Sequence, residues 1–211
     1  LIRRGVFRVI CGTSVGAIHA GFLASTAHIP GHDTERLLNL WRNLRIEEML
    51  RLSVGHLVRF PIELHGLFKP SHRAKGVLIN ASLMRQLVRQ NAAWEKIGPN
   101  IRAGHLDALT VSATHVMSGK TTVFLEHRDS NCPAWSRDPR VDVCPTRITH
   151  EHVLASAAIP ILFAPMKIGG RYFTDGGVRQ NTPLSPALRL GCDRVLVVGL
   201  RHREKESELS K

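Results

Sequence analysis

The chain has 211 residues, 43% of them hydrophobic, and a formal net charge of +12. This length and apolar content indicate one folded domain with a sizeable core and exclude a disordered chain. No apolar run approaches the ~20 residues that a membrane-spanning helix requires.

The positive charge is carried mostly by dispersed arginines, which form no compact basic cluster. A basic surface attracts anionic partners, either nucleic acid or acidic lipid headgroups. Only 5% of the residues are aromatic, and no basic–aromatic interleaving typical of single-strand binding is present. The most favoured explanation of the positive charge is therefore a general arginine bias without a dedicated partner. Binding to an anionic membrane surface is the next, and binding to nucleic acid is the least favoured.

Four cysteines are too few for a disulfide scaffold, and none forms a C-x-x-C pair. This usage predicts a reducing compartment, and so a cytoplasmic protein that can lie peripherally on a membrane. Cys11 and Cys192 adjoin apolar runs and are predicted to be core thiols. Two histidines and two cysteines could be drawn as a zinc set, but their spacing matches no standard finger. That set is His127, Cys132, Cys144 and His150. We expect neither a metal nor another cofactor.

The first chemical motif is Gly12-Thr13-Ser14-Val15-Gly16. A β-branched run precedes it and small, apolar residues follow, which predicts a strand, a sharp bend and a helix. In that context G-x-S-x-G is a nucleophile elbow, with Ser14 as the nucleophile. Side chains at Gly12 or Gly16 are expected to collide with the crossing strand and helix. The Val15 N–H, at the positive end of the helix, is the candidate oxyanion donor.

Helical spacing of apolar residues then predicts a helix over 34–44, capped by Asp33, and another ending at Gln90, capped by Asn80. Between them, residues 45–75 show only a weak pattern. We interpret this stretch as short helices and loop that could cover the site.

Two strands are predicted next, over 107–114 and 121–125. Residues 126–147 are rich in polar groups and proline and are predicted to be an exposed loop. A helix over 150–158, capped by Thr149, follows.

The last third of the chain begins with a hairpin over 166–173, whose turn is Gly169-Gly170. A helix starting at Thr182 and Pro183 and a buried apolar strand over 194–200 complete the pattern. Strands that alternate with helices predict an α/β fold with a mostly parallel sheet covered on both faces.

Asp175 follows the hairpin and precedes Gly176 and Gly177. These glycines allow the backbone to approach another element closely. A lone Asp-Gly-Gly is often an ordinary turn. A serine nucleophile needs a base, however, and the small residues of 155–160 would let two backbones pack closely. Asp175 is therefore the candidate base.

Three motifs in this order resemble the patatin-like phospholipase family: Gly12–Gly16, Ala155-Ser156-Ala157-Ala158-Ile159-Pro160, and Tyr172-x-x-Asp175-Gly176-Gly177. The similarity extends through Asn181-x-Pro183 to Asp193. The resemblance implies a three-layer α/β sandwich and a Ser–Asp dyad that cleaves acyl esters of phospholipids or other lipids. Ser14 would be the nucleophile and Asp175 the general base.

In this family a strand, a glycine-rich oxyanion loop and a helix precede the elbow. Residues 1–211 are therefore expected to form a single patatin-like domain that lacks this first strand and loop. Losing one oxyanion donor typically costs ~10²–10³ in rate.

Two alternatives remain open at this stage. The chain order Ser14, Asp175, His202 fits an esterase with a Ser–Asp–His triad. The basic charge also fits a non-catalytic protein that binds lipid at a membrane surface.

Overall fold

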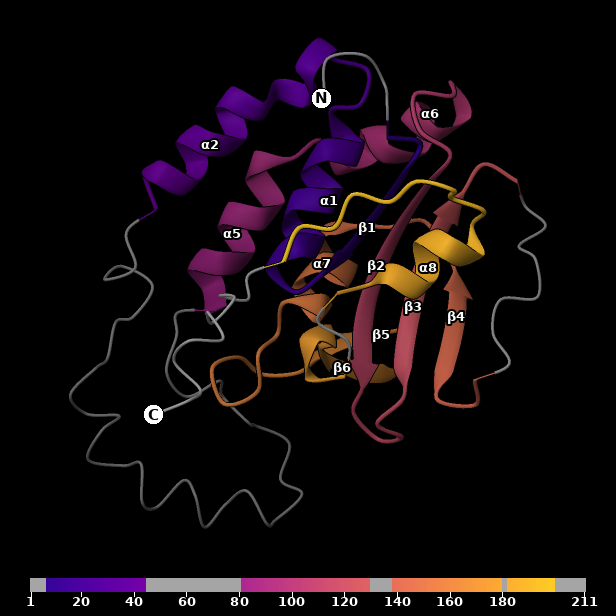
Figure 1. Ribbon diagram of the computed structural model, residues 1–211. Helices are drawn as coiled ribbons and strands as arrows, with labels where there is room; N and C mark the ends of the chain where they lie inside the picture. The colour runs from indigo at the N-terminus through magenta and orange to yellow at the C-terminus, as the bar shows by residue number, and fades with distance from the viewer. Residues whose placement is uncertain (1–6, 45–80, 130–137, 180–181, 200–211) are drawn as a thin grey trace, which may run out of the picture.

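The computed structural model describes residues 7–44, 81–129, 138–179 and 182–199 (Figure 1). Within these residues a six-stranded sheet has the order β4-β3-β2-β6-β5, and β1 also pairs with β2. The strands are β1 (Val9–Thr13), β2 (Ala108–His115), β3 (Thr121–His127), β4 (Val141–Pro145), β5 (Met166–Ile168) and β6 (Arg171–Asp175). The α-helices are α1 (Val15–Ser25), α2 (Thr34–Arg42), α5 (Ala81–Asn91), α6 (Ile97–Arg102), α7 (His150–Ser156) and α8 (Leu184–Arg189). Short 3-10 helices span Pro30–Asp33, Trp94–Lys96 and Gly176–Val178.

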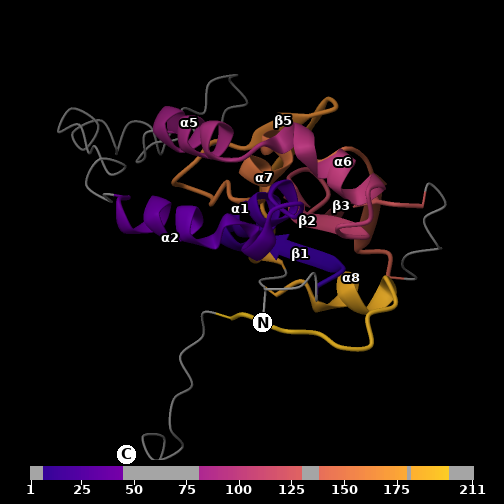
Figure 2. The ribbon, with the colours of Figure 1, turned by 90° about the horizontal axis from the view of Figure 1, so that it is seen from above.

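Helices cover both faces of the sheet (Figure 2). α1, α5, α6 and α7 lie on one face, over a core that includes Val111, Phe124 and Val153. α8 lies on the other face, where Leu190 packs against a smaller cluster of Ala108, Val123 and Leu125. The predicted α/β three-layer sandwich is confirmed.

β2 is the buried centre of the sheet, and two strands share one of its edges. β1 runs parallel to β2 opposite residues 108–112, and its last residue, Thr13, faces Ser112. β6 runs antiparallel to β2 opposite residues 113–115, and its last residue, Asp175, faces Ala113. β1 and β6 therefore meet end to end along this edge.

The expectation of a mostly parallel sheet is wrong for the described strands. β1–β2 and β3–β4 are parallel, whereas β2–β3, β2–β6 and β5–β6 are antiparallel. The turns that join β2 to β3 and β5 to β6 are too short for a crossover, which parallel pairing requires. Gly169 and Gly170, with φ of 54° and 81°, form the second of these turns, as predicted.

Three further features differ from what the sequence predicted. The supposed loop over 126–147 contains β4, whose Pro145 lies at the end of an edge strand, where a missing N–H is tolerated. α6 was not predicted, because Gly98 and Pro99 in its first turn obscured the helical pattern. Residues 194–199 form no strand, and Val195 to Val198 are exposed, because an apolar run needs a partner edge as well as propensity.

The helix caps agree with the sequence only in part. Thr149 caps α7, as predicted, and His152 completes a capping box with it. Asp33 occupies the N-cap of α2 with φ of 52°, but its side chain makes no capping bond. At α8 the N-cap is Pro183 rather than Thr182. Asn80 and the candidate cover over 45–75 lie outside the described residues.

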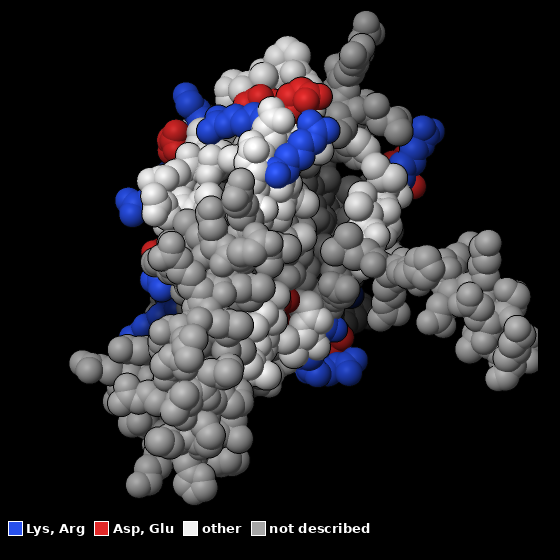
Figure 3. All heavy atoms as spheres, turned by 90° about the vertical axis from the view of Figure 1, so that its left-hand side faces the viewer, with Lys and Arg blue, Asp and Glu red and all other residues white. Residues whose placement is uncertain are grey.

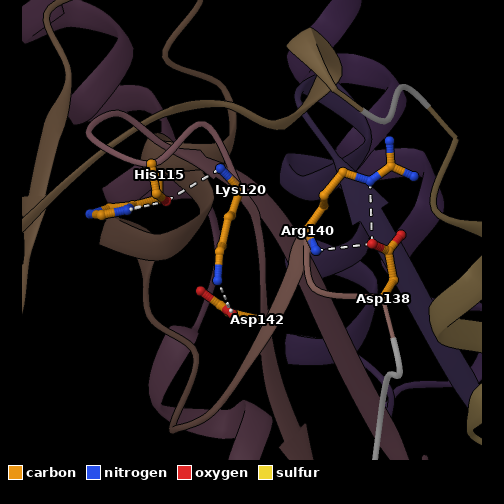
Figure 4. Close-up of polar contacts among 6 residues, drawn as sticks. His115, Lys120, Asp138, Arg140 and Asp142 are labelled. Carbon is orange, nitrogen blue, oxygen red and sulfur yellow. Dashed lines mark hydrogen bonds and ion pairs between the residues drawn. The ribbon is translucent and has the colours of Figure 1, made fainter.

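Polar contacts tie the turn after β2 to β4 at one end of the sheet (Figure 4). His115 Nδ1 lies 2.7 Å from Ser118 Oγ, and Lys120 Nζ lies 3.4 Å from Asp142 Oδ1. Arg140 pairs with Asp138 beside them. Such exposed ion pairs contribute little to stability, so the sheet depends on its buried residues.

His152 connects α7 to the core. Its Nδ1 accepts a hydrogen bond from the Thr149 N–H at 3.1 Å, and its ring packs edge-on against Phe124. Burial lowers the pKa of His152 below the ordinary histidine value. Burial also lowers the pKa of His19 in α1.

Acidification is therefore expected to destabilise the protein. The unfolded chain binds these protons first, so the free energy of unfolding should fall as the pH drops below about 6.5. His152→Gln keeps an acceptor at the same capping position. It should reduce the fall in the free energy of unfolding on acidification to the part that His19 causes. Urea denaturation at neutral and mildly acidic pH measures the effect, with exposed His105→Gln as the control. An unchanged pH dependence in His152→Gln would contradict the assignment.

Candidate active site

The side chains of Ser14 and Asp175 meet where β1 and β6 end. Ser14 Oγ donates a hydrogen bond to Asp175 Oδ2 at 2.5 Å. Asp175 is only 4% exposed. Its Oδ1 accepts a bond from the Gly177 N–H at 2.6 Å, and its backbone carbonyl accepts one from Thr114 Oγ1 at 2.9 Å. These bonds orient the carboxylate so that Oδ2 faces the hydroxyl.

Ser14 itself has an unusual backbone conformation, with φ of 55° and ψ of −128°. A non-glycine residue pays a steric cost in this region, and such strain is common at active sites. The Ser14 N–H donates to Ser156 Oγ at 2.9 Å, and Ser156 Oγ donates to the Ser112 carbonyl at 2.6 Å. The sequence predicted Ser156 only as one of several small residues, although it is the single hydroxyl in that buried stretch.

Val15 is the first residue of α1. Backbone N–H groups in the first turn have no acceptor within the helix, and the helix dipole is positive at this end. The Val15 N–H is therefore at the positive end of α1, directly after Ser14 in the chain, and its role as an oxyanion donor stays a prediction.

Two glycines allow the backbones to approach closely at the site. A Cβ at Gly12 would lie 2.5 Å from the Gly16 carbonyl oxygen and 2.6 Å from Ala17 Cα. A Cβ at Gly176 would overlap the Ser112 carbonyl oxygen. The predicted collision at Gly16 is wrong, because apart from its neighbours in the chain and the backbone of α1 itself no heavy atom lies within 4 Å of a Cβ built there.

An apolar groove lies between α1, α2 and α5, and one of its lining residues is Ile18, one helical turn after Ser14. Nearly all of its surface is apolar. The groove is lined by Ile18, Phe22, Leu37, Leu40, Trp41, Leu44, Met84, Leu87, Val88, Asn91, Ala92 and Trp94. His19 packs edge-on against Trp41 beside it.

The other candidates from the sequence are the four zinc-set residues, the two predicted core thiols and His202. In the described part of the chain, no three His, Cys, Asp or Glu side chains are arranged to hold a metal ion. Cys132 and His202 lie outside that part. Cys11 is partly buried, and desolvation raises the pKa of its thiol to about 11; Cys192 is also partly buried.

The described Lys and Arg side chains are spread among Asp and Glu on the face that Figure 3 shows, and they form no continuous basic patch there. An anionic membrane partner therefore stays a prediction from net charge. Of the helices described, none has the length and hydropathy needed to cross a membrane.

The family model of the patatin-like phospholipases matches residues 3–188, and the chain belongs to that family. The family consists of lipid acyl hydrolases. A comparison with curated proteins found no match.

The two elbow glycines give opposite predictions for substitution by alanine. Gly12→Ala should lower the free energy of unfolding by about 3 kcal/mol, because its Cβ meets backbone atoms that cannot move independently. Gly16→Ala, in open space in the first turn of α1, should leave it unchanged or raise it by up to about 1 kcal/mol. Chemical denaturation of both variants checks this, and equal effects would contradict the geometry of the elbow.

Proposed function

We propose that the protein is a lipid acyl hydrolase of the phospholipase A or lysophospholipase type, with Ser14 as nucleophile and Asp175 as general base. The observation that carries the proposal is the 2.5 Å hydrogen bond between Ser14 Oγ and the buried Asp175 carboxylate. A serine hydroxyl is a weak nucleophile unless a base takes its proton, and the pair supplies both groups.

In the proposed reaction, Ser14 Oγ attacks the ester carbonyl carbon while its proton passes to Asp175 Oδ2. The Val15 N–H stabilises the resulting oxyanion. Collapse of the tetrahedral intermediate releases the alcohol, which takes the proton from Asp175, and leaves an acyl group on Ser14. Water then attacks the acyl-enzyme as Asp175 accepts its proton, and Ser14 regains that proton when the fatty acid leaves.

The groove beside α1 supports a lipid rather than a small polar ester as substrate. Ile18, four residues after the proposed nucleophile, lines it, and the lining offers almost no hydrogen-bonding groups to a bound chain. An acyl chain attached to Ser14 Oγ could lie along it. Burying each methylene would contribute about 0.8 kcal/mol.

The two alternatives differ from this proposal in what they require. A Ser–Asp–His triad requires His202. A non-catalytic lipid-binding protein has no use for a hydroxyl paired with a buried carboxylate. A fluorophosphonate probe, which reacts only with an activated serine, separates an enzyme from such a binding protein.

Asp175→Asn should reduce kcat for ester hydrolysis by about 10³-fold, because the amide keeps the shape of the side chain but cannot accept the Ser14 proton. Steady-state kinetics of the full-length protein on a phospholipid and on a p-nitrophenyl ester measures the loss. His202→Ala is the control and should retain activity. Activity retained in Asp175→Asn, or lost in His202→Ala, would contradict the dyad.

Leu87→Trp should shift the enzyme toward short acyl chains, because the indole fills part of the groove. Blocking three methylenes would cost about 2.4 kcal/mol, or roughly 50-fold in kcat/KM, on a p-nitrophenyl palmitate. Hydrolysis of p-nitrophenyl butyrate should change little. The matched control is Leu38→Trp, which changes an exposed leucine of α2 outside the groove. Equal losses on both esters would argue against the groove as the acyl site.

A further inference from the structure

The junction of β1 and β6 on the edge of β2 leaves a gap in strand pairing. β1 pairs with β2 up to Ser112, and β6 pairs with β2 from Ala113 onward. The Ser112 carbonyl points at this junction, against Gly176. A buried backbone carbonyl requires a hydrogen-bond donor, and a side chain must supply it where a strand does not.

Ser156 supplies that donor from the end of α7. Its side chain is fully buried, and its single hydroxyl proton is directed to the Ser112 carbonyl at 2.6 Å. With the proton committed there, the oxygen can only accept from Ser14, whose N–H lies 2.9 Å away. One hydroxyl therefore connects the central strand to the backbone of the elbow.

We propose that Ser156 is a positioning residue for Ser14. Its hydrogen bond holds the Ser14 backbone at a φ of 55°, the conformation in which Oγ reaches Asp175 Oδ2. It also occupies the Ser14 N–H, which leaves the Val15 N–H as the oxyanion donor from the elbow. Ser156 acts through Ser14 and takes no part in proton transfer. The catalytic consequence rests on the proposed function, whereas the contact itself does not.

The alternative is a purely steric role, in which only the small size of Ser156 matters because it lets α7 approach β2. Ser156→Ala separates the two roles, because alanine is no larger than serine and makes neither hydrogen bond. Ser25→Ala is the matched control. Ser25 is also fully buried in a helix and loses one hydroxyl bond, to the Phe22 carbonyl, at the opposite end of α1 from Ser14.

The experiment combines amide hydrogen exchange at Ser14, followed by NMR, with steady-state kinetics and thermal unfolding of the full-length protein. In Ser156→Ala the Ser14 amide should exchange at least about tenfold faster, and kcat should fall by about 10²-fold with little change in KM, as expected for a misplaced nucleophile. Ser25→Ala, which loses one buried hydrogen bond rather than two, should lower the unfolding temperature by a smaller amount and leave kcat and the Ser14 amide unchanged.

Three outcomes would overturn the proposal. Unchanged exchange at Ser14 in Ser156→Ala would show that the hydroxyl does not hold this amide. Faster exchange with unchanged kcat would show that the contact has no effect on catalysis. An equal loss of kcat in Ser25→Ala would show that Ser156→Ala lowers kcat only by destabilising the whole protein. A wild-type protein without esterase activity would instead refute the proposed function, and the exchange measurement would still decide whether Ser156 holds Ser14.

Discussion

The site depends on one edge of β2 being shared by two strands that approach from opposite directions. β1 and β6 end opposite neighbouring residues of β2. Ser14, which directly follows β1, and Asp175, the last residue of β6, are therefore brought together although 161 positions separate them in sequence. A single continuous strand along this edge would leave no place where the ends of two strands meet. The proposed nucleophile and base are thus fixed by the pairing of the sheet rather than by a loop.

Glycines and hydrogen bonds at the junction allow the ends of β1 and β6 to lie this close together. Gly176 allows the turn after β6 to lie directly against the Ser112 carbonyl, and Gly12 allows β1 to pass close to α1. The Ser156 hydroxyl satisfies the Ser112 carbonyl at the junction, and the Gly177 N–H satisfies one oxygen of the Asp175 carboxylate. The two glycines remove steric overlap and the two hydrogen bonds satisfy buried polar atoms where the strand ends meet. Together these contacts hold Ser14 in a strained backbone conformation.

The sequence was informative where a motif has a strong local cause. Gly12 in the elbow, the Thr149 cap and the Gly169-Gly170 turn act over a few residues, and these features and the α/β class could be predicted. Ser156 was named but not understood, because its bonds reach residues 44 and 142 positions away. The strand order, the mixed sheet and β4 likewise depend on distant pairing, which one sequence does not encode locally.

The central claim is that Ser14 is activated by Asp175. Its most direct test is to label the full-length protein with a fluorophosphonate and to locate the adduct by peptide mass spectrometry, in the wild type and in Asp175→Asn. A single adduct on Ser14 is expected, formed about a hundredfold more slowly in the variant. An adduct on a different residue, or equal rates in the two proteins, would contradict it.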